Sequence, residues 1–188
     1  MMGEHQKEVI GGCPYSTHLE VTVACAVRSG MLWPGSKILE LGCGDYSTPV
    51  LASISAAQDR PLTIISSDRN WSARYKYLVG NRIDIQSIDW PEWPRVTFED
   101  TYGMVLVDNE QTVKQRLGLV KRLASRANLI VLHDANAVER DRYSWHPTLR
   151  LFRYLYVHRQ LRPYTAVMSN YVDPQAWFES GDTQEYNW

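Results

Sequence analysis

Ionisable side chains follow two apolar segments of the sequence, at the point where each segment ends. Asp108 comes directly after the run 104–107. His133 and Asp134 come directly after the run 129–132. A histidine has an unperturbed pKa near neutrality, so it can act as a general base toward a bound hydroxyl while a nearby carboxylate orients its ring. Asp108, His133 and Asp134 are therefore the candidate catalytic residues.

The same region allows a second mechanism, in which a divalent cation activates the hydroxyl. Asp108, Asp134 and Asn136 offer two carboxylates and an amide oxygen, and such oxygens are the ligands that Mg²⁺ takes in proteins. A cation bound to the hydroxyl oxygen lowers the pKa of that hydroxyl. A structural role, in which His133 caps the sheet edge and Asp134 caps a turn, is the third interpretation, and the sequence leaves all three open.

A glycine-containing turn lies earlier in the chain, within the stretch ILELGCGDYST at 38–48. Gly42 and Gly44 allow the backbone to turn tightly and to approach a ligand, and the N-terminus of a following helix favours a negatively charged group. The dinucleotide fingerprint requires glycine three residues after Gly44, where this chain has Ser47. This difference disfavours a dehydrogenase, although the two glycines alone leave the cofactor undecided.

Short apolar runs alternate with helical patterns along the chain, which is typical of a parallel sheet covered by helices. Most of the runs are rich in β-branched residues and show little alternation, as expected of strands buried on both faces. The runs are 37–41, 62–67, 83–88, 104–107 and 129–132. In a doubly wound sheet, ligands bind at the carboxyl ends of the strands, where this sequence places Gly42, Asp68, Asp89, Asp108 and Asp134.

Capping signals predict the helices between these runs. Thr17 with Glu20, Thr48 with Pro49, and Asn70 have the residue types of helix N-caps and first turns. The helix that follows Thr17 is expected to end near residue 30, and the next helix is expected to start at Thr48. The helix that Asn70 would cap is expected to end near residue 80. Another helix is expected after residue 109, a last one over 148–161, and then a hairpin formed by 164–169 and 176–179.

The glycine turn resembles motif I of the class I S-adenosylmethionine-dependent methyltransferases. Glu40 matches the acid that this family carries two places before the first glycine. Tyr46 stands where the common form of the motif has its third glycine, so the loop departs from the family pattern there. The resemblance implies that this loop binds S-adenosyl-L-methionine through Glu40, Gly42, Cys43, Gly44, Tyr46 and Ser47.

Two further stretches extend the resemblance, which covers roughly residues 17–179. LTIISSDRN, at 62–70, is similar to the second motif, where Asp68 would take both ribose hydroxyls and Arg69 would pack on the adenine. IDIQSIDWPEW, at 83–93, is similar to the third motif, where Asp89 would accept from the adenine amino group and Trp90 would flank the ring. Asp108 is placed at the methyl end. The implied fold is an α/β, Rossmann-like, doubly wound and mostly parallel seven-stranded sheet, with helices on both faces and an antiparallel C-terminal hairpin.

The resemblance implies methyl transfer, and the acids and histidine at the strand ends favour a small hydroxyl-bearing acceptor. The order of Asp108 and Asp134 is similar to the metal-dependent catechol-type O-methyltransferases, but those have adjacent Asp and Asn where this chain has Asp134, Ala135 and Asn136. One alternative is an RNA or other nucleic-acid methyltransferase that uses the arginines of 140–162. Others are a cofactor-binding protein of the same fold without turnover, and a non-methylating relative such as a hydroxylase.

Length and composition limit the remaining possibilities. The 188 residues fit a single methyltransferase domain, with 1–16 as an N-terminal lid or arm and 180–188 as an acidic tail. A net charge of −1 disfavours nucleic-acid binding by bulk electrostatics. No apolar run approaches the roughly 20 residues that cross a bilayer, so we expect a cytoplasmic protein with no membrane partner. The sequence gives no indication of oligomeric state.

Cysteines and loops complete the prediction. Cys13, Cys25 and Cys43 are odd in number and widely spaced, which suits thiols better than disulfides or a closed zinc site. The segments 11–17 and 143–147 are expected to form lids over the cofactor. From position alone, the side chains that would touch substrate are His18, Tyr143, Trp145 and His146.

Overall fold

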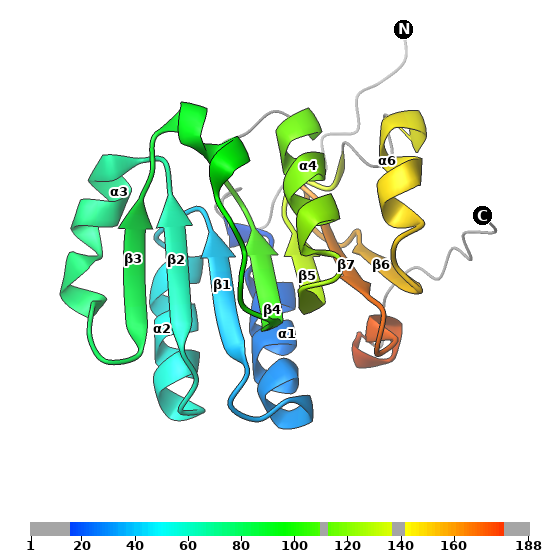
Figure 1. Ribbon diagram of the computed structural model, residues 1–188. Helices are drawn as coiled ribbons and strands as arrows, with labels where there is room; N and C mark the ends of the chain where they lie inside the picture. Colours follow the sequence, from blue (N-terminus) through cyan, green and yellow to red (C-terminus); the bar gives the residue numbers. More distant parts are fainter. Residues whose placement is uncertain (1–15, 110–112, 137–141, 179–188) are drawn as a thin grey trace, which may run out of the picture.

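A seven-stranded sheet forms the centre of the molecule in the computed structural model, which describes residues 16–109, 113–136 and 142–178 (Figure 1). The strands follow the order β3-β2-β1-β4-β5-β7-β6. Strands β1 to β5 are parallel, and β7 runs antiparallel to both β5 and β6. Their bounds are β1 Lys37–Leu41, β2 Leu62–Ser66, β3 Ile83–Ser87, β4 Tyr102–Val107, β5 Ala127–Leu132, β6 Tyr154–His158 and β7 Thr165–Ser169.

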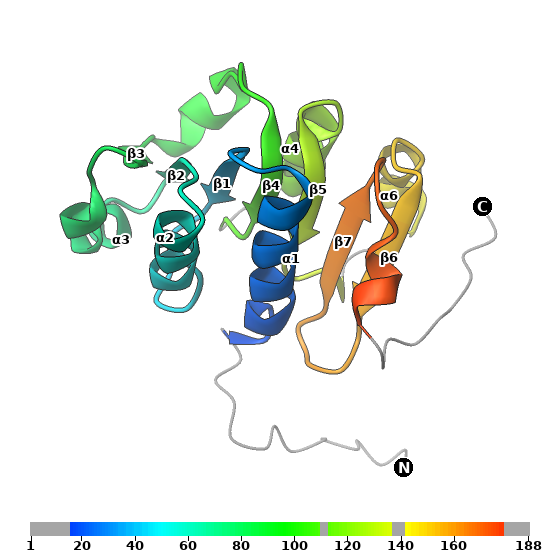
Figure 2. The same cartoon turned by 90° about the horizontal axis from the view of Figure 1, so that it is seen from below.

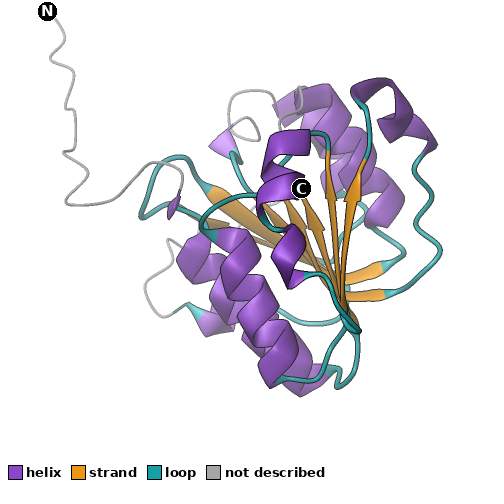
Figure 3. Cartoon of the chain, turned by 90° about the vertical axis from the view of Figure 1, so that its left-hand side faces the viewer, coloured by secondary structure: helices purple, strands orange, loops and turns teal. Residues whose placement is uncertain are grey.

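Helices cover both faces of this sheet, as Figures 2 and 3 show. Helices α1 (Leu19–Leu32) and α2 (Ser47–Ala57) lie on one face. Helices α4 (Val113–Leu123) and α6 (Arg142–Leu149) lie on the other, while α3 (Arg69–Arg74) follows β2. Short 3₁₀ helices complete the described segments at Lys76–Leu78, Trp90–Arg95 and Pro174–Trp177. No helix of the described residues is long and apolar enough to span a membrane.

Both faces of the central strands are buried, which explains why their sequences read as continuous apolar runs. In β4, Met104 and Leu106 belong to the core beneath α1 and α2, while Val105 and Val107 belong to the core beneath α4 and α6. Successive side chains of a strand point to opposite faces, so each strand contributes to both cores. The predicted doubly wound α/β fold is confirmed, and the predicted strands agree with the observed ones to within two residues at each end.

The C-terminal third differs from the prediction. The segment 148–161 does not form a helix, because α6 ends at Leu149 and the chain continues as β6. β6 pairs with β7, so the hairpin is built from these two strands rather than from 164–169 and 176–179. Ala176 instead lies in the 3₁₀ helix, which Asp173 caps by accepting from the backbone N–H of Gln175 at 3.0 Å. The predicted strand end at Glu179 lies outside the described residues.

The remaining domain predictions are not decided by the described residues. The proposed lid or arm at 1–16 is described only from Ser16 onward, and the acidic tail at 180–188 lies outside the described residues. Cys13 also lies outside them. The second proposed lid, 143–147, falls within helix α6 rather than in a loop. Trp145 of that helix is buried in the core with Leu149, which gives its indole a packing role.

Candidate functional site at the carboxyl edge of the sheet

The loop after β1 lies against the loop after β4. Gly42 has a φ of +116°, and a Cβ atom there would lie 2.4 Å from the carbonyl oxygen of Asp108. Only glycine tolerates both this backbone conformation and this close approach. The first glycine of the turn therefore brings the loop at 42–46 next to Asp108, at the point where the strand order reverses between β1 and β4.

Glu40 binds this loop through side-chain hydrogen bonds. Its side chain is only 1% exposed and accepts hydrogen bonds from Ser47 Oγ at 2.5 Å and from Thr48 Oγ1 at 3.0 Å. The backbone N–H of Gly44 donates to Thr48 Oγ1 at 3.0 Å, which links the loop to the same cluster. Burial raises the pKa of Glu40 to about 8, although the two hydroxyl donors oppose the shift. Glu40 thus holds the loop to the start of α2.

The predicted N-cap of α2 is wrong for a related reason. The N-cap is Tyr46, which has no side-chain cap hydrogen bond, and Thr48 lies within the first turn, where its hydroxyl binds Glu40 instead. Cys43, in the middle of the loop, is half-buried, and burial raises the pKa of its thiol to about 11. The cofactor contacts predicted for Cys43, Tyr46 and Ser47 stay predictions.

Asp68 caps α3 at the end of β2. Its Oδ1 accepts from the backbone N–H groups of Asn70 at 2.8 Å and Trp71 at 3.1 Å, so Asp68, not the predicted Asn70, is the N-cap. Both cap bonds use Oδ1, and Oδ2 of the same carboxylate takes no part in the cap. The carboxylate thus has one oxygen that the cap does not use.

Arg69 and Asp89 form an ion pair between the ends of β2 and β3. Arg69 Nη2 lies 2.8 Å from each carboxylate oxygen of Asp89, and both side chains are largely exposed. Two residues that were predicted to contact adenine are therefore in contact with each other. Trp90 begins the 3₁₀ helix at Trp90–Arg95, but its side chain lies outside the described residues.

Asp108 and His133 form the central polar contact of the site. His133 Nδ1 lies 2.7 Å from Asp108 Oδ1, and His133 Nε2 lies 3.2 Å from the hydroxyl oxygen of Thr17. Thr17 Oγ1 also donates to the carbonyl oxygen of Pro163 at 3.1 Å. Burial alone would raise the pKa of Asp108, but the hydrogen bond from His133 and the nearby cationic groups bring it below its ordinary value. The predicted capping box is wrong, because the Thr17 hydroxyl serves His133 and α1 has no side-chain cap.

His18 completes a cluster with these two residues. It is 1% exposed, its Nε2 lies 3.7 Å from Asp108 Oδ2, and its ring centroid lies 4.4 Å from that of His133. Neither ring nitrogen of His18 has a hydrogen-bond partner. Burial lowers the pKa of His18 to about 4, against the opposing attraction of Asp108, so its imidazole is neutral near pH 7. The position of His18 in the sequence predicted that it lies near substrate, but no local sequence pattern predicted its contact with Asp108.

Asp134 and Asn136 lie beside this cluster, with Asp134 Oδ1 3.9 Å from His133 Nε2. Asp134 has a φ of +57°, and its Oδ2 accepts from Nη1 of Arg116 at 2.9 Å. Arg116 extends from α4 and also donates to the backbone carbonyls of Asn109 and His133. Asn136 Oδ1 accepts from the backbone N–H of Tyr164 at 2.6 Å. The predicted Mg²⁺ site stays a prediction, and the Oδ1 of Asn136 that would bind the cation already accepts from this backbone N–H.

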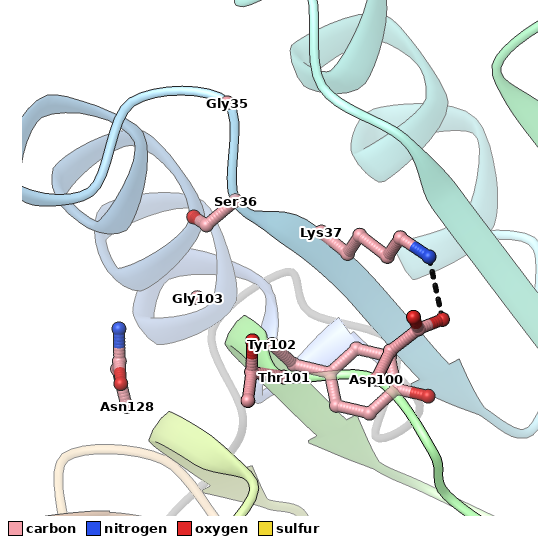
Figure 4. Close-up of a pocket in the computed structure, with 8 residues that line it drawn as sticks. All are labelled: Gly35, Ser36, Lys37, Asp100, Thr101, Tyr102, Gly103 and Asn128. Carbon is pink, nitrogen blue, oxygen red and sulfur yellow. Dashed lines mark hydrogen bonds and ion pairs between the residues drawn. The ribbon is translucent and has the colours of Figure 1, made fainter.

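A separate hollow lies at the opposite edge of the sheet, where the strands begin (Figure 4). This cavity of about 430 Å³ is bordered by residues from the starts of β1 and β4, including Lys37 and Tyr102. Lys37 Nζ lies 2.5 Å from Asp100 Oδ2, so the charges at its rim are paired. The cavity is distant in the fold from the loop at Gly42 and from Asp108.

The fold is similar to that of known methyltransferases. No protein-family model matches the sequence, and no curated protein sequence is significantly similar to it. Cofactor-bound Rv0187 from MTB superimposes with a TM-score of 0.55 at 13% identity over 81% of both chains. The O-methyltransferase TomG from Streptomyces achromogenes, in complex with SAM, gives 0.55 at 14% identity over 79% of both chains. WbdD gives 0.53 at 15% identity, covering 80% of this chain and 39% of that one. The chain has the fold of the class I S-adenosylmethionine-dependent methyltransferases.

Proposed function

We propose that the protein is an S-adenosylmethionine-dependent methyltransferase that acts on a hydroxyl group of a small molecule. The contact between Asp108 and His133 carries this proposal. It places a carboxylate and an imidazole 2.7 Å apart beside the loop at Gly42, where the fold binds its cofactor. A protein that only bound the cofactor would not need an acid–base pair at this position.

The cofactor would lie along the carboxyl ends of β1, β2 and β3. Gly42 and Gly44 provide a close backbone approach, and Oδ2 of Asp68 can accept from a ribose hydroxyl. Arg69 and Asp89 would lie at the adenine side, and opening of their exposed ion pair would cost little. When bound, S-adenosylmethionine supplies an electrophilic methyl group.

His133 is suited to accept the proton of the hydroxyl. Its Nδ1–H donates to Asp108, which fixes the ring orientation. The Thr17 hydroxyl can donate to a neutral Nε2, or it can donate to the carbonyl of Pro163 and accept from a protonated Nε2. Both charge states of His133 therefore have a hydrogen-bonding partner, which is what a group that gains and loses a proton requires.

A small-molecule acceptor fits the described arginines better than a nucleic acid does. The predicted helix 148–161 would have presented several arginines on one face, but this segment is divided between α6, a turn and β6. Arg153 lies over the ring of Tyr154 and donates its backbone N–H to Asn170, and Arg162 contacts Tyr164. The segment 148–161 thus offers no single basic helix face.

Calorimetry with S-adenosylmethionine and its demethylated product tests the cofactor part of the proposal. Asp68→Asn retains an N-cap acceptor but loses the carboxylate, so we expect weaker binding with an unchanged free energy of unfolding. Asp173→Asn is the matched control, because Asp173 caps a 3₁₀ helix in the same manner away from the site. A wild-type protein that binds neither compound would contradict the proposal. Equal affinity in Asp68→Asn would remove the ribose contact.

Methyl release from labelled cofactor in the presence of a panel of hydroxyl compounds tests the catalytic part. His133→Gln should lower kcat by about 10²- to 10⁴-fold while cofactor affinity is retained. Repeating the assay with a chelator and with Mg²⁺ separates the base mechanism from the predicted Mg²⁺ site. Tight cofactor binding without methyl release under any of these conditions would favour the non-catalytic alternative.

A further inference from the structure

Three side chains converge on one point between α1, β4 and β5. His18, Asp108 and His133 each offer one ligand atom, and these atoms all lie within 4.8 Å of one another. We propose that His18, Asp108 and His133 form a binding site for a divalent transition-metal ion of the Zn²⁺, Co²⁺ or Fe²⁺ type. This site differs from the predicted Mg²⁺ site in two of its three residues, and binding at it does not depend on the methyl transfer proposed above.

The contacts of Asp108 have the spacing of ligands around one ion. His133 Nδ1 is 2.7 Å from Oδ1, and His18 Nε2 is 3.7 Å from Oδ2, which is too long for a hydrogen bond. Two ligand atoms at about 2.1 Å from a common ion lie about 3 to 3.5 Å apart. One observed spacing is slightly shorter than this range and the other slightly longer, and each involves a different oxygen of the carboxylate. Small side-chain rotations would bring the three atoms to a single ion.

The hydrogen bonds around His133 orient Nδ1 as a ligand. When the Thr17 hydroxyl donates to the Pro163 carbonyl, its oxygen can accept from Nε2–H of His133, and this tautomer leaves Nδ1 free to bind an ion. In that tautomer the lone pair of Nδ1 lies 2.7 Å from a carboxylate oxygen, and a cation bound by both atoms removes the repulsion between them. That cation is either a proton or a metal ion. Metal-binding histidines typically have such a second hydrogen bond through their other nitrogen.

His18 supplies an independent observation. Its ring is 1% exposed, and neither nitrogen has a hydrogen-bond partner. Leaving buried polar atoms unpaired costs about 1 to 3 kcal/mol. A bound ion would satisfy Nε2, the nitrogen that faces Asp108.

The donor set selects the class of metal. Two imidazoles and one carboxylate favour borderline ions, whereas Mg²⁺ prefers oxygen ligands and retains several waters. Three protein ligands leave one or more positions open, as in catalytic rather than structural sites. The metal form leaves His133 with its hydrogen on Nε2, so an ion on Nδ1 and the use of His133 as a base exclude each other.

Titration of the tag-free, chelator-treated full chain with Co²⁺ tests the site, because the visible absorption of the ion reports its coordination. We expect one Co²⁺ per chain, with competition by Zn²⁺ and little competition by Mg²⁺. His18→Ala and Asp108→Asn should each weaken binding more than Thr17→Val, which removes only the orienting hydroxyl and should cost about 10- to 100-fold. His158→Gln is the control, because His158 is also buried but belongs to β6.

Each outcome decides for or against the site. Unchanged Co²⁺ affinity in His18→Ala, or an equal loss in His158→Gln, would overturn it. Thermal unfolding of the metal-free variants checks that they are folded. If a variant does not fold, X-ray absorption of the wild-type Zn²⁺ form decides, since two imidazole ligands support the site and their absence refutes it. A wild-type chain that binds no Co²⁺ but still binds S-adenosylmethionine would refute this inference alone.

Discussion

Glu40→Gln tests the burial of the acid beneath the glycine loop. Glu40 is 1% exposed, and its folded-state pKa is about 8, against 4.5 in the unfolded chain. The folded protein therefore binds more protons than the unfolded chain between these values, so this group makes the protein less stable as pH rises from 4.5 to 8. At 1.36 kcal/mol per pH unit the upper limit is about 5 kcal/mol, and relaxation and water entry should reduce it to about 2 kcal/mol.

Glutamine resembles the protonated acid in shape and cannot ionise. The free energy of unfolding of Glu40→Gln should therefore be close to the wild-type value near pH 5 and exceed it by about 2 kcal/mol near pH 8. Urea unfolding followed by tryptophan fluorescence at several pH values measures this difference. Glu92→Gln makes the same chemical change at an exposed position and should give a difference that does not vary with pH. A pH-independent difference for Glu40→Gln as well would refute the burial argument.

Three other predictions concern stability. Gly42→Ala should lower the free energy of unfolding, measured in urea, by more than about 3 kcal/mol, because its added Cβ meets backbone atoms. Gly35→Ala, also at positive φ but in open space, should lower it by about 1 kcal/mol. Similar losses would argue against the close approach at Gly42. Between pH 6.5 and 4, the folded pKa of about 4 for His18 makes the free energy of unfolding of the wild type fall by up to about 3 kcal/mol as pH falls. His18→Gln, measured with a chelator present, should reduce this fall. An equal fall in the free energy of unfolding in His18→Gln would contradict this prediction. Arg60→Met should cost about 2 to 4 kcal/mol, since its buried guanidinium donates to two backbone carbonyls, and the exposed Arg82→Met should cost under about 1 kcal/mol. Equal costs would show that burial does not matter there.

The parallel strands could be predicted from the sequence, because strands that are buried on both faces consist of continuous runs of apolar residues. The sequence was misleading at 148–161, where Leu149, Phe152, Leu155 and Tyr156 have helical spacing. Leu155 and Tyr156 also fit a strand, because they face different cores: Leu155 packs on the α4 side and Tyr156 on the α1 side. Pairing with β7 decides between the two patterns, and this pairing is a tertiary interaction that no local window contains.

The side-chain hydroxyls show the same limit at the site. Thr17 and Thr48 have the residue type of N-caps, and local reasoning assigned them to the nearest helix start. Their actual partners are His133, 116 positions away, and the buried Glu40. A buried polar group that solvent cannot reach competes for a hydroxyl more strongly than a helix terminus that solvent can reach. Arg116 was missed for a similar reason, since its partners become neighbours only when α4 packs beside the end of β5.

The meeting of Asp108 and His133 follows from sheet register. The backbone ladder continues one residue past the strands, because Asp108 N–H donates to the Leu41 carbonyl and His133 N–H donates to the Val107 carbonyl. Asp108 and His133 therefore occupy adjacent places on one rung. Because Val107 faces the core under α4, Asp108 faces the side of α1, and the same alternation directs His133 there. His18 precedes α1 on that side, so strand alternation and helix placement together determine which histidine joins the pair.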